Sequence, residues 1–262
     1  MNASTRPTAL VTGASGGIGM HLAECFARDG HDLVLVARSA DALARLAADW
    51  GARYGVRIAA VAADLSREDG VDAVVAALRE RGLAVDALVN NAGVGMYGAF
   101  SDTRLDDELA MMRLNMLALT ALTKRLLPGL IARRGRILNV ASTAAFQPGP
   151  YMAVYYATKA YVLSFSEALA DELAADGVTV TALCPGPTHS GFQARAAIGR
   201  IGLLRVLPLF DAATVAAQGY RAMRRGRRVY VPGLANRLLA QSVRVTPRRL
   251  ITAIVRRLNA PR

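Results

Sequence analysis

The sequence predicts an α/β protein whose core is an open, doubly wound parallel sheet of about seven strands with helices on both faces. Short apolar runs alternate with longer amphipathic stretches, which is the pattern of strands joined by crossover helices. The runs 33–36 and 87–89 are continuously apolar, as in strands that are buried on both faces. No linker rich in Pro, Gly or Ser divides the 262 residues, so we expect a single domain, 1–262.

The elements can be placed in order from their spacing. Short runs rich in β-forming residues predict strands at 9–12, 32–37, 57–62, 84–90, 135–141, 179–184 and 228–231. Apolar residues at helical spacing predict helices at 17–29, 40–54, 68–81, 106–133 and 154–175. After 185–187 the pattern loosens, because the apolar stretch 196–210 is interrupted by arginines and a proline. Residues 233–258 indicate helical pieces broken at Pro247.

Composition excludes several classes of protein. Hydrophobic residues make up 53% and charged residues 20% of the chain, which argues against disorder and against a fibrous protein. No stretch approaches eighteen uninterrupted apolar residues, and the polar start lacks the features of a secretory signal. Cys25 and Cys184 are far apart, so we expect neither a disulfide framework nor a metal site. These features favour a cytoplasmic protein.

The positive charge is concentrated in the last quarter of the chain. Residues 191–262 hold 15 arginines and one acidic residue, Asp211, whereas residues 1–190 hold 17 basic and 19 acidic residues. Such asymmetry suggests an anionic partner, whether membrane headgroups, nucleic acid or an acidic carrier. The alternative is an arginine-rich surface that only meets water. We define 233–262 as the basic C-terminal extension.

A glycine-rich turn directly follows the first predicted strand and opens the first helix, with Gly13, Ser15, Gly17, Ile18 and Gly19 inside it. The first glycine allows a tight turn, the second lets the backbone approach a pyrophosphate, and the third permits close packing of helix on strand. The helix N-terminus adds unpaired N–H groups. The turn therefore predicts a dinucleotide site on a Rossmann-type sheet.

The end of the second strand indicates which dinucleotide is bound. An NAD site places an acidic residue there to hold the ribose 2′-hydroxyl. This chain has Arg38 and Ser39 instead, and Asp32 stands at the wrong end of the strand. A guanidinium suits a 2′-phosphate, so the sequence favours NADP(H) over NAD(H). Arg38 could instead be a solvated charge at the end of the strand.

Seven motifs in order resemble the short-chain dehydrogenases/reductases over roughly residues 8–190. They are the turn 12–19, Ala63-Asp64-Leu65, Asn90-Asn91-Ala92-Gly93, Asn115, Ser142, Tyr155-x-x-x-Lys159 and Pro185-Gly186. The resemblance implies an NAD(P)-dependent enzyme that interconverts a carbonyl and an alcohol. It implies catalytic roles for Ser142, which holds the substrate oxygen, Tyr155, the general acid, and Lys159. It also implies that Asn115 holds a water that relays protons, although its amide could simply satisfy a neighbouring backbone carbonyl.

The pair Tyr155 and Lys159 can be judged on its chemistry. A phenol with a pKa of about 10 is a poor acid–base group at neutral pH. An ammonium at about 4 Å in an effective dielectric of about 20 supplies roughly 4 kcal/mol, which equals about three pKa units. A helix places residues four apart on one face. We therefore expect Lys159 to lower the pKa of Tyr155.

The resemblance assigns the remaining cofactor contacts. It places Asn91, Ala92 and Gly93 beneath the adenosine ribose, Asp64 with Leu65 beside the adenine, and Pro185, Gly186 and Thr188 beside the nicotinamide, where Lys159 and Tyr155 also lie. Thr188 and Ser190 depart from the residues usual at these places in the family, and Ser15 and Gly16 lack the basic residue that many of its NADP-using members carry.

The resemblance also implies a substrate lid at about 190–210, and its mostly apolar residues favour a lipophilic carbonyl such as a long acyl chain or polycyclic ketone. Relatives pair through the helices expected at 106–133 and 154–175, so a homodimer or homotetramer is expected. Two alternatives remain. One is an NADP-binding sensor or scaffold without turnover. The other is a peripheral membrane protein that binds through the basic extension, at the inner surface of the membrane; scarce aromatic residues there disfavour nucleic acid.

Overall fold

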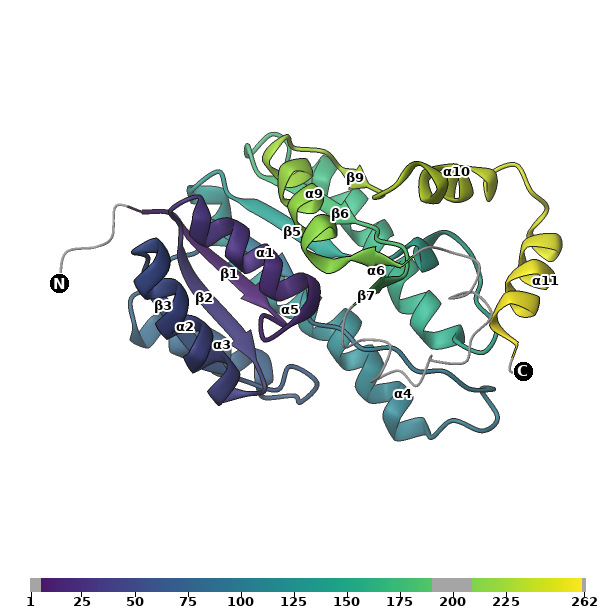
Figure 1. Ribbon diagram of the computed structural model, residues 1–262, viewed down its shortest axis with the longest axis horizontal. Coiled ribbons are helices and arrows are strands. Elements are labelled where there is room, and N and C mark those ends of the chain that lie inside the picture. Colours follow the sequence, from purple (N-terminus) through teal and green to yellow (C-terminus); the bar gives the residue numbers. More distant parts are fainter. Residues whose placement is uncertain (1–5, 190–208, 261–262) are drawn as a thin grey trace.

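The computed structural model describes residues 6–189 and 209–260, and its core is the parallel sheet that the sequence predicts (Figure 1). Seven strands follow the order β3-β2-β1-β4-β5-β6-β9, and every neighbouring pair is parallel. Their bounds are β1 Thr8–Thr12, β2 Asp32–Ala37, β3 Ile58–Ala62, β4 Ala87–Asn90, β5 Arg136–Val140, β6 Thr179–Leu183 and β9 Val229–Tyr230. All seven predicted strands are present, and most differ from the prediction by a few residues at their ends.

Helices cover both faces of the sheet, because each carries one apolar stripe that must be buried. One face is covered by α1 (Gly17–Arg28), α2 (Ala40–Tyr54) and α9 (Ala212–Arg224). The other is covered by α3 (Gly70–Glu80), α5 (Leu119–Ala132) and α6 (Ala153–Glu172). Side chains of β2 and β4 are buried on both sides, as the uninterrupted apolar runs 33–36 and 87–89 predict.

The strand order reverses beside β1, which pairs with β2 on one side and with β4 on the other. In an open α/β sheet, the crevice outside the carboxyl ends of the strands at such a reversal is where ligands bind. The glycine-rich turn follows β1 at this edge, and the loops after β4 and β5 leave the sheet at the same edge. The topology therefore brings three of the predicted motifs together.

The helix predicted over 106–133 is not a uniform α-helix. α4 (Leu105–Met112) passes into a π-helical segment, Arg113–Ala118, which passes into α5. A π segment inserts extra backbone into a helical turn and is often found at functional sites. Apolar periodicity does not report such an insertion, so the expectation of one regular helix was wrong here. Pairing of copies through this helix and α6 stays a prediction.

The last part of the chain is more structured than its sequence pattern suggested. β7 (Thr188–His189) pairs in parallel with β8 (Phe210–Asp211). Except for residues 209 and 210, the predicted lid 190–210 lies outside the described residues. The basic extension forms α10 (Leu234–Ser242) and α11 (Arg248–Asn259), at the end of the molecule farthest from α2 and β3 (Figure 1). Within the described ranges, no helix is both long enough and apolar enough to cross a bilayer.

Candidate active site

A cavity of about 1030 Å³ lies along the carboxyl edge of the sheet. Most of the predicted site residues line it: Gly13, Ser15, Gly17, Ile18, Arg38, Asp64, Leu65, Asn91, Ala92, Gly93, Ser142, Tyr155, Lys159, Pro185, Gly186 and Thr188. Gly19, Ser39 and Asn115 are not part of this lining. The structure therefore brings the predicted cofactor and catalytic residues to one place.

The glycine-rich turn has the backbone that its sequence predicts. Gly13 has φ +65° and Gly17 has φ +57°, a region that side chains with a Cβ rarely adopt. A Cβ on Gly19 would lie 2.4 Å from the carbonyl oxygen of Gly13, so helix α1 can pack this closely only through a glycine. Gly16 caps α1 without a side-chain hydrogen bond, which leaves the first amides of the helix to bind phosphate.

Asn91 braces this turn from the neighbouring strand. Its Nδ2 donates to the carbonyl oxygens of Thr12 (2.9 Å) and Gly13 (3.2 Å). The Thr12 hydroxyl oxygen accepts from the backbone N–H groups of Asn91 and Ala92, each at 3.0 Å. The family resemblance predicted Asn91 beneath the ribose and gave Thr12 no role of its own. The structure shows that both hold the turn in shape.

The residues near the predicted 2′-phosphate position support the cofactor argument. Arg38 is exposed at the cavity edge, whereas Asp32 is buried and accepts two hydrogen bonds from the Arg57 guanidinium at 2.8 and 2.9 Å. Asp32 is therefore structural, as its place at the start of β2 predicted. Ser39 caps α2 by accepting from the Ala42 N–H at 3.3 Å. That bond still leaves the hydroxyl hydrogen of Ser39 to donate.

Asp64 lies at the same end of the cavity. Its carboxylate accepts from the hydroxyl and the N–H of Ser66, at 2.6 and 3.0 Å. These bonds, together with the Arg38 guanidinium nearby, hold the pKa of Asp64 below its usual range. The carboxylate is therefore charged near neutral pH, which suits its predicted role as an acceptor for an adenine amino group.

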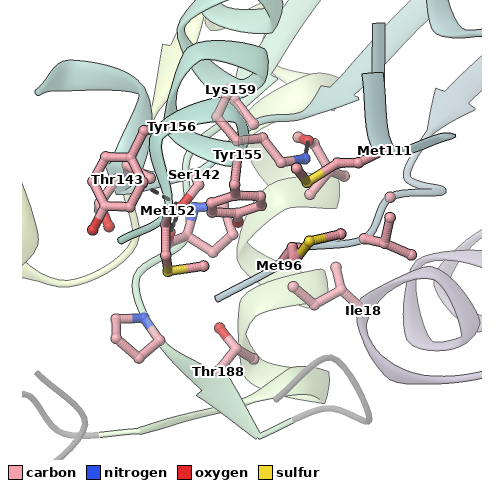
Figure 2. A pocket seen from close by; sticks show the side chains of 18 of the residues that line it. Ile18, Met96, Met111, Ser142, Thr143, Met152, Tyr155, Tyr156, Lys159 and Thr188 are labelled. Atoms are coloured by element: carbon pink, nitrogen blue, oxygen red, sulfur yellow. Dashed lines mark hydrogen bonds between the residues drawn. The ribbon is translucent and has the colours of Figure 1, made fainter. Parts of the chain in front are cut away.

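Tyr155 and Lys159 lie one turn apart on α6, with their side chains directed into the cavity (Figure 2). The Lys159 Nζ lies 5.9 Å from the Tyr155 ring centroid and donates to the carbonyl oxygen of Val140 at 2.9 Å. Both residues are buried. The helix therefore places the pair on one face, as the spacing predicted.

The electrostatics of this pair differ from the expectation. Burial raises the pKa of the Tyr155 phenol, and its hydrogen bond with Ser142 reverses only part of that rise. Burial also lowers the pKa of Lys159 to about 8. The expected net lowering of the Tyr155 pKa by Lys159 was wrong, because the desolvation of a fully buried phenol is the larger effect. Near neutral pH Tyr155 is a neutral phenol that can donate its proton.

Ser142 stands immediately beyond β5 and begins a short 3₁₀ turn, Thr143–Phe146. Its hydroxyl accepts from the Ala144 N–H at 3.1 Å and donates to the Pro185 carbonyl at 3.4 Å. The Thr143 N–H donates to that same carbonyl at 2.9 Å. These contacts fix Ser142 between the Tyr155 hydroxyl and the Pro185–Gly186 segment.

Asn115 lies in the π-helical segment behind the cavity and is 2% exposed. Its Nδ2 donates to the Val94 carbonyl (2.9 Å) and the Thr158 hydroxyl (3.1 Å), and its Oδ1 accepts from the Val94 N–H (3.0 Å). The side chain thus ties the loop after β4 to α6, in agreement with the alternative role of satisfying neighbouring backbone groups. A role in a proton relay stays a prediction.

Comparison with known proteins agrees with this geometry. A sequence model described as short chain dehydrogenase matches residues 7–199, which is more than half of the chain. The chain belongs to the short-chain dehydrogenase family. The oxidoreductase UcpA of Salmonella typhimurium is 39% identical over 188 residues, which are 71% of this chain and 71% of that protein.

Two solved structures match this short-chain dehydrogenase over most of its length. A short-chain dehydrogenase from Sphingobium yanoikuyae in complex with NADPH has 36% identity and a TM-score of 0.81, covering 90% of this chain and 92% of that one. A bulky-bulky ketone specific alcohol dehydrogenase from Comamonas testosteroni has 32% identity and a TM-score of 0.77, covering 94% and 96%.

One wall of the cavity in this short-chain dehydrogenase was not predicted from the sequence. α10 and α11 contribute Asn236, Leu239, Ala240, Ser242, Ile251, Ile254, Val255, Leu258 and Asn259 to the lining. Ile251 and Val255 pack in one buried cluster with Met111, Met152 and Tyr155. Figure 2 shows Met96, Met111 and Met152 around Tyr155. The basic extension therefore lines the same cavity as the predicted catalytic residues.

Proposed function

We propose that this short-chain dehydrogenase reduces a lipophilic ketone or 3-oxoacyl compound to an alcohol with NADPH, and that Tyr155 is the general acid. The observation that carries the proposal is the gathering of Ser142, Tyr155 and Lys159 in the cavity that also contains the glycine-rich turn. A sensor or scaffold would not need a proton donor and a buried lysine on one face of a helix.

The residues of the chain have separate tasks in this reaction. NADPH, when bound, would supply the hydride for the carbonyl carbon. Ser142 and Tyr155 hold the carbonyl oxygen by their hydroxyl groups, and Tyr155 donates its proton to that oxygen as the alcohol forms. The Lys159 ammonium stabilises the phenolate that remains. The high pKa of Tyr155 keeps the proton on the phenol until the carbonyl oxygen gains negative charge.

NADP(H) as the cofactor is supported by Arg38 at the cavity edge, by the structural role of Asp32 and by the NADPH complex of the Sphingobium protein. We expect Arg38→Asp to weaken NADPH binding about tenfold to hundredfold, because one charge-assisted contact with a 2′-phosphate is lost. NADH binding should change far less. Fluorescence titration with each cofactor gives the two dissociation constants and their ratio.

The matched control is Arg79→Asp, which makes the same charge change at an exposed residue of α3. It should change the ratio of the NADPH and NADH dissociation constants by less than about twofold, since Arg79 lies outside the cavity. If the wild-type chain binds NADH as tightly as NADPH, the assignment of Arg38 is wrong, and the reductase proposal then continues with NADH as cofactor.

A lipophilic substrate is supported by the apolar lining around Tyr155. The side chains of Met96, Met111 and Met152 lie close to the ring, and α11 adds Ile251 and Val255. Methionine adapts to irregular apolar shapes, so this lining suits a bulky hydrocarbon group next to the carbonyl. The Comamonas relative is named for bulky ketones, which agrees with this proposal.

A second candidate function is peripheral binding to an anionic membrane surface. The basic extension combines exposed arginines with exposed apolar side chains, as interfacial helices do. The exposed apolar residues are Leu234, Leu238, Leu239, Val245, Leu250 and Ile254. The described residues 233–260 contain no acidic side chain. This binding is compatible with reduction of a lipid.

Vesicles test this second function. At low salt, phosphatidylglycerol vesicles should sediment the full chain, and Arg256→Gln with Arg257→Gln should weaken binding about 30-fold, because each arginine near the surface contributes about 1 kcal/mol. The control Arg45→Gln with Arg79→Gln removes the same charge from α2 and α3 and should bind like the wild type. Absence of sedimentation, or equal effects of both pairs, would rule out the extension as a membrane anchor.

A further inference from the structure

Two buried asparagines, Asn236 on α10 and Asn259 on α11, attach the basic extension to the active-site cavity. We infer that Asn259 is a positioning residue that fixes α11 as the outer wall of the substrate site and thereby selects carbonyl compounds with a bulky apolar group. The inference rests on the proposed reductase function and names the part of the chain that determines its substrate size.

Asn259 connects α11 to the loop after β4 and to the start of α6 through three hydrogen bonds. Its side-chain Nδ2 donates to the Pro150 carbonyl at 3.1 Å and to the Tyr156 hydroxyl at 3.4 Å. Its backbone carbonyl accepts from the Tyr97 hydroxyl at 2.7 Å. Pro150 and Tyr156 flank the start of α6, whereas Tyr97 lies in the loop after β4. The last turn of α11 is thus fastened to both segments that border the substrate side of the cavity.

The burial of Asn259 shows that this attachment is not a loose surface contact. The residue is 0% exposed, and both hydrogens of its amide have acceptors. Its Oδ1 is buried and has no hydrogen-bond partner within the described part of the chain. An unpaired buried acceptor lowers stability, so packing alone would favour an apolar residue there. The donor groups of Asn259 therefore serve to position the helix.

The attached helix presents an apolar face to the catalytic tyrosine. Ile251, Val255 and Asn259 follow each other at intervals of four residues, which places them on one face of α11. Ile251 and Val255 are 5% exposed and pack in the cluster that contains Tyr155 and Met152. If α11 moved outward, a bulky group next to the carbonyl would lose its apolar contacts with these side chains.

Asn236 packs the other end of the extension against the cofactor side. Its Nδ2 donates to the Pro232 carbonyl at 2.9 Å. A Cβ on Gly186 would lie 2.5 Å from that same nitrogen, so the amide packs directly on the Pro185–Gly186 segment. The extension is therefore held at both ends, by Asn236 next to the predicted nicotinamide segment and by Asn259 next to Tyr156.

A fixed wall makes a specific prediction about substrate size. We expect phenyl hexyl ketone to reach the apolar face of α11 and the much smaller 2-butanone to stay next to Tyr155. Asn259→Ala should raise KM for phenyl hexyl ketone about tenfold, which is the effect of losing one buried hydrogen-bonding group. The values of kcat, KM for 2-butanone and the NADPH dissociation constant should stay within about twofold. Selectivity for the bulky ketone over the small one then falls about tenfold.

Tyr97→Phe removes the second attachment with little change in volume and should lower selectivity in the same direction. Both side chains act on the last turn of α11. The loss of selectivity in the variant that combines Tyr97→Phe with Asn259→Ala should therefore be smaller than the sum of the two single losses. The control is Thr252→Val, which removes a 2.9 Å bond from the Thr252 hydroxyl to the Arg248 carbonyl on the same helix. Its selectivity should match the wild type.

Unchanged selectivity in Asn259→Ala, or an equal change in Thr252→Val, would overturn the inference and leave Asn259 a structural residue. NADPH titration and thermal unfolding show that each variant is folded. Calorimetric binding of the two ketones to NADPH-loaded chains with Tyr155→Phe gives the same comparison without turnover. A wild type that binds both ketones but reduces neither would refute the reductase proposal and leave the inference about α11 intact. If neither ketone bound, the role of α11 in substrate binding would be refuted.

Discussion

Replacing Tyr155 with phenylalanine is expected to lower kcat for ketone reduction about a thousandfold while NADPH binding stays within about threefold. The variant keeps the ring that packs with Met111, Met152 and Ile251, so the cavity retains its shape. It loses the hydroxyl that donates the proton to the carbonyl oxygen. Initial rates at pH 7 with saturating NADPH, together with a fluorescence titration, measure the two quantities separately.

The matched control for this variant is Tyr161→Phe on the same helix. The Tyr161 hydroxyl lies 2.7 Å from the Thr120 hydroxyl and does not line the cavity, so its loss removes a hydrogen bond without touching the site. We expect full activity within about twofold. If Tyr155→Phe kept more than about a tenth of the wild-type rate, Tyr155 would not be the proton donor, and the cavity would have to use another group.

The fold of this chain could be predicted because its elements are specified locally. Continuous apolar runs such as 33–36 fit strands that are buried on both faces, and the amphipathic stretches between them fit crossover helices. The glycine-rich turn was equally predictable, since φ values of +57° and +65° at Gly17 and Gly13 require residues without a Cβ. The candidate catalytic residues came from the resemblance, and the structure brings Ser142, Tyr155 and Lys159 to one cavity.

Other features depend on contacts that no local pattern contains. Asn91 holds the glycine-rich turn across 78 residues of sequence, and Asn259 reaches Tyr97 across 162. An asparagine in a loop or at a helix end looks the same whether it is solvated or buried. The π-helical segment around Asn115 was missed because an inserted residue shifts the phase of the apolar pattern without ending it, so the stretch still matches a helix.

The basic extension shows why a correct local pattern can still leave the function open. An amphipathic helix has an apolar face that can cover a membrane surface or a cavity, and its sequence is the same in both cases. Here Ile251 and Val255 cover the cavity, while Leu250 and the arginine pair 256–257 stay exposed. The sequence pattern indicated the exposed face, and only the packing revealed that the other face lines the active site.

The electrostatics of Lys159 lead to the second large effect. Burial lowers its pKa to about 8, so the ammonium is disfavoured in the folded chain relative to the unfolded one. The reduction rate should fall above about pH 8, because the neutral amine no longer stabilises the phenolate of Tyr155. We expect Lys159→Met to lower kcat about a hundredfold to a thousandfold and to remove this dependence. A pH–rate profile from pH 6 to about 9 with saturating substrates measures both.

The same variant should be more stable than the wild type. The unfolded lysine has a pKa of about 10.4, so between there and about pH 8 the unfolded chain binds more protons and stability rises with pH. Below that range the buried ammonium of Lys159 lowers the free energy of unfolding by about 3 kcal/mol. Methionine removes this cost but also loses the hydrogen bond to Val140, which reduces the gain by about 1 kcal/mol. At pH 7 we therefore expect a gain of about 2 kcal/mol, or about 4–8 °C in Tm.

Lys124→Met is the control, because Lys124 is the other lysine of the chain and is exposed on α5. It should change neither Tm nor the pH–rate profile. An inactive Lys159→Met variant with a lower Tm would show that the lysine is required for the fold, and its loss of activity would then say nothing about proton transfer. A higher Tm with lost activity shows the opposite: the buried ammonium is a strain that the fold tolerates at the reacting tyrosine, where its charge is used.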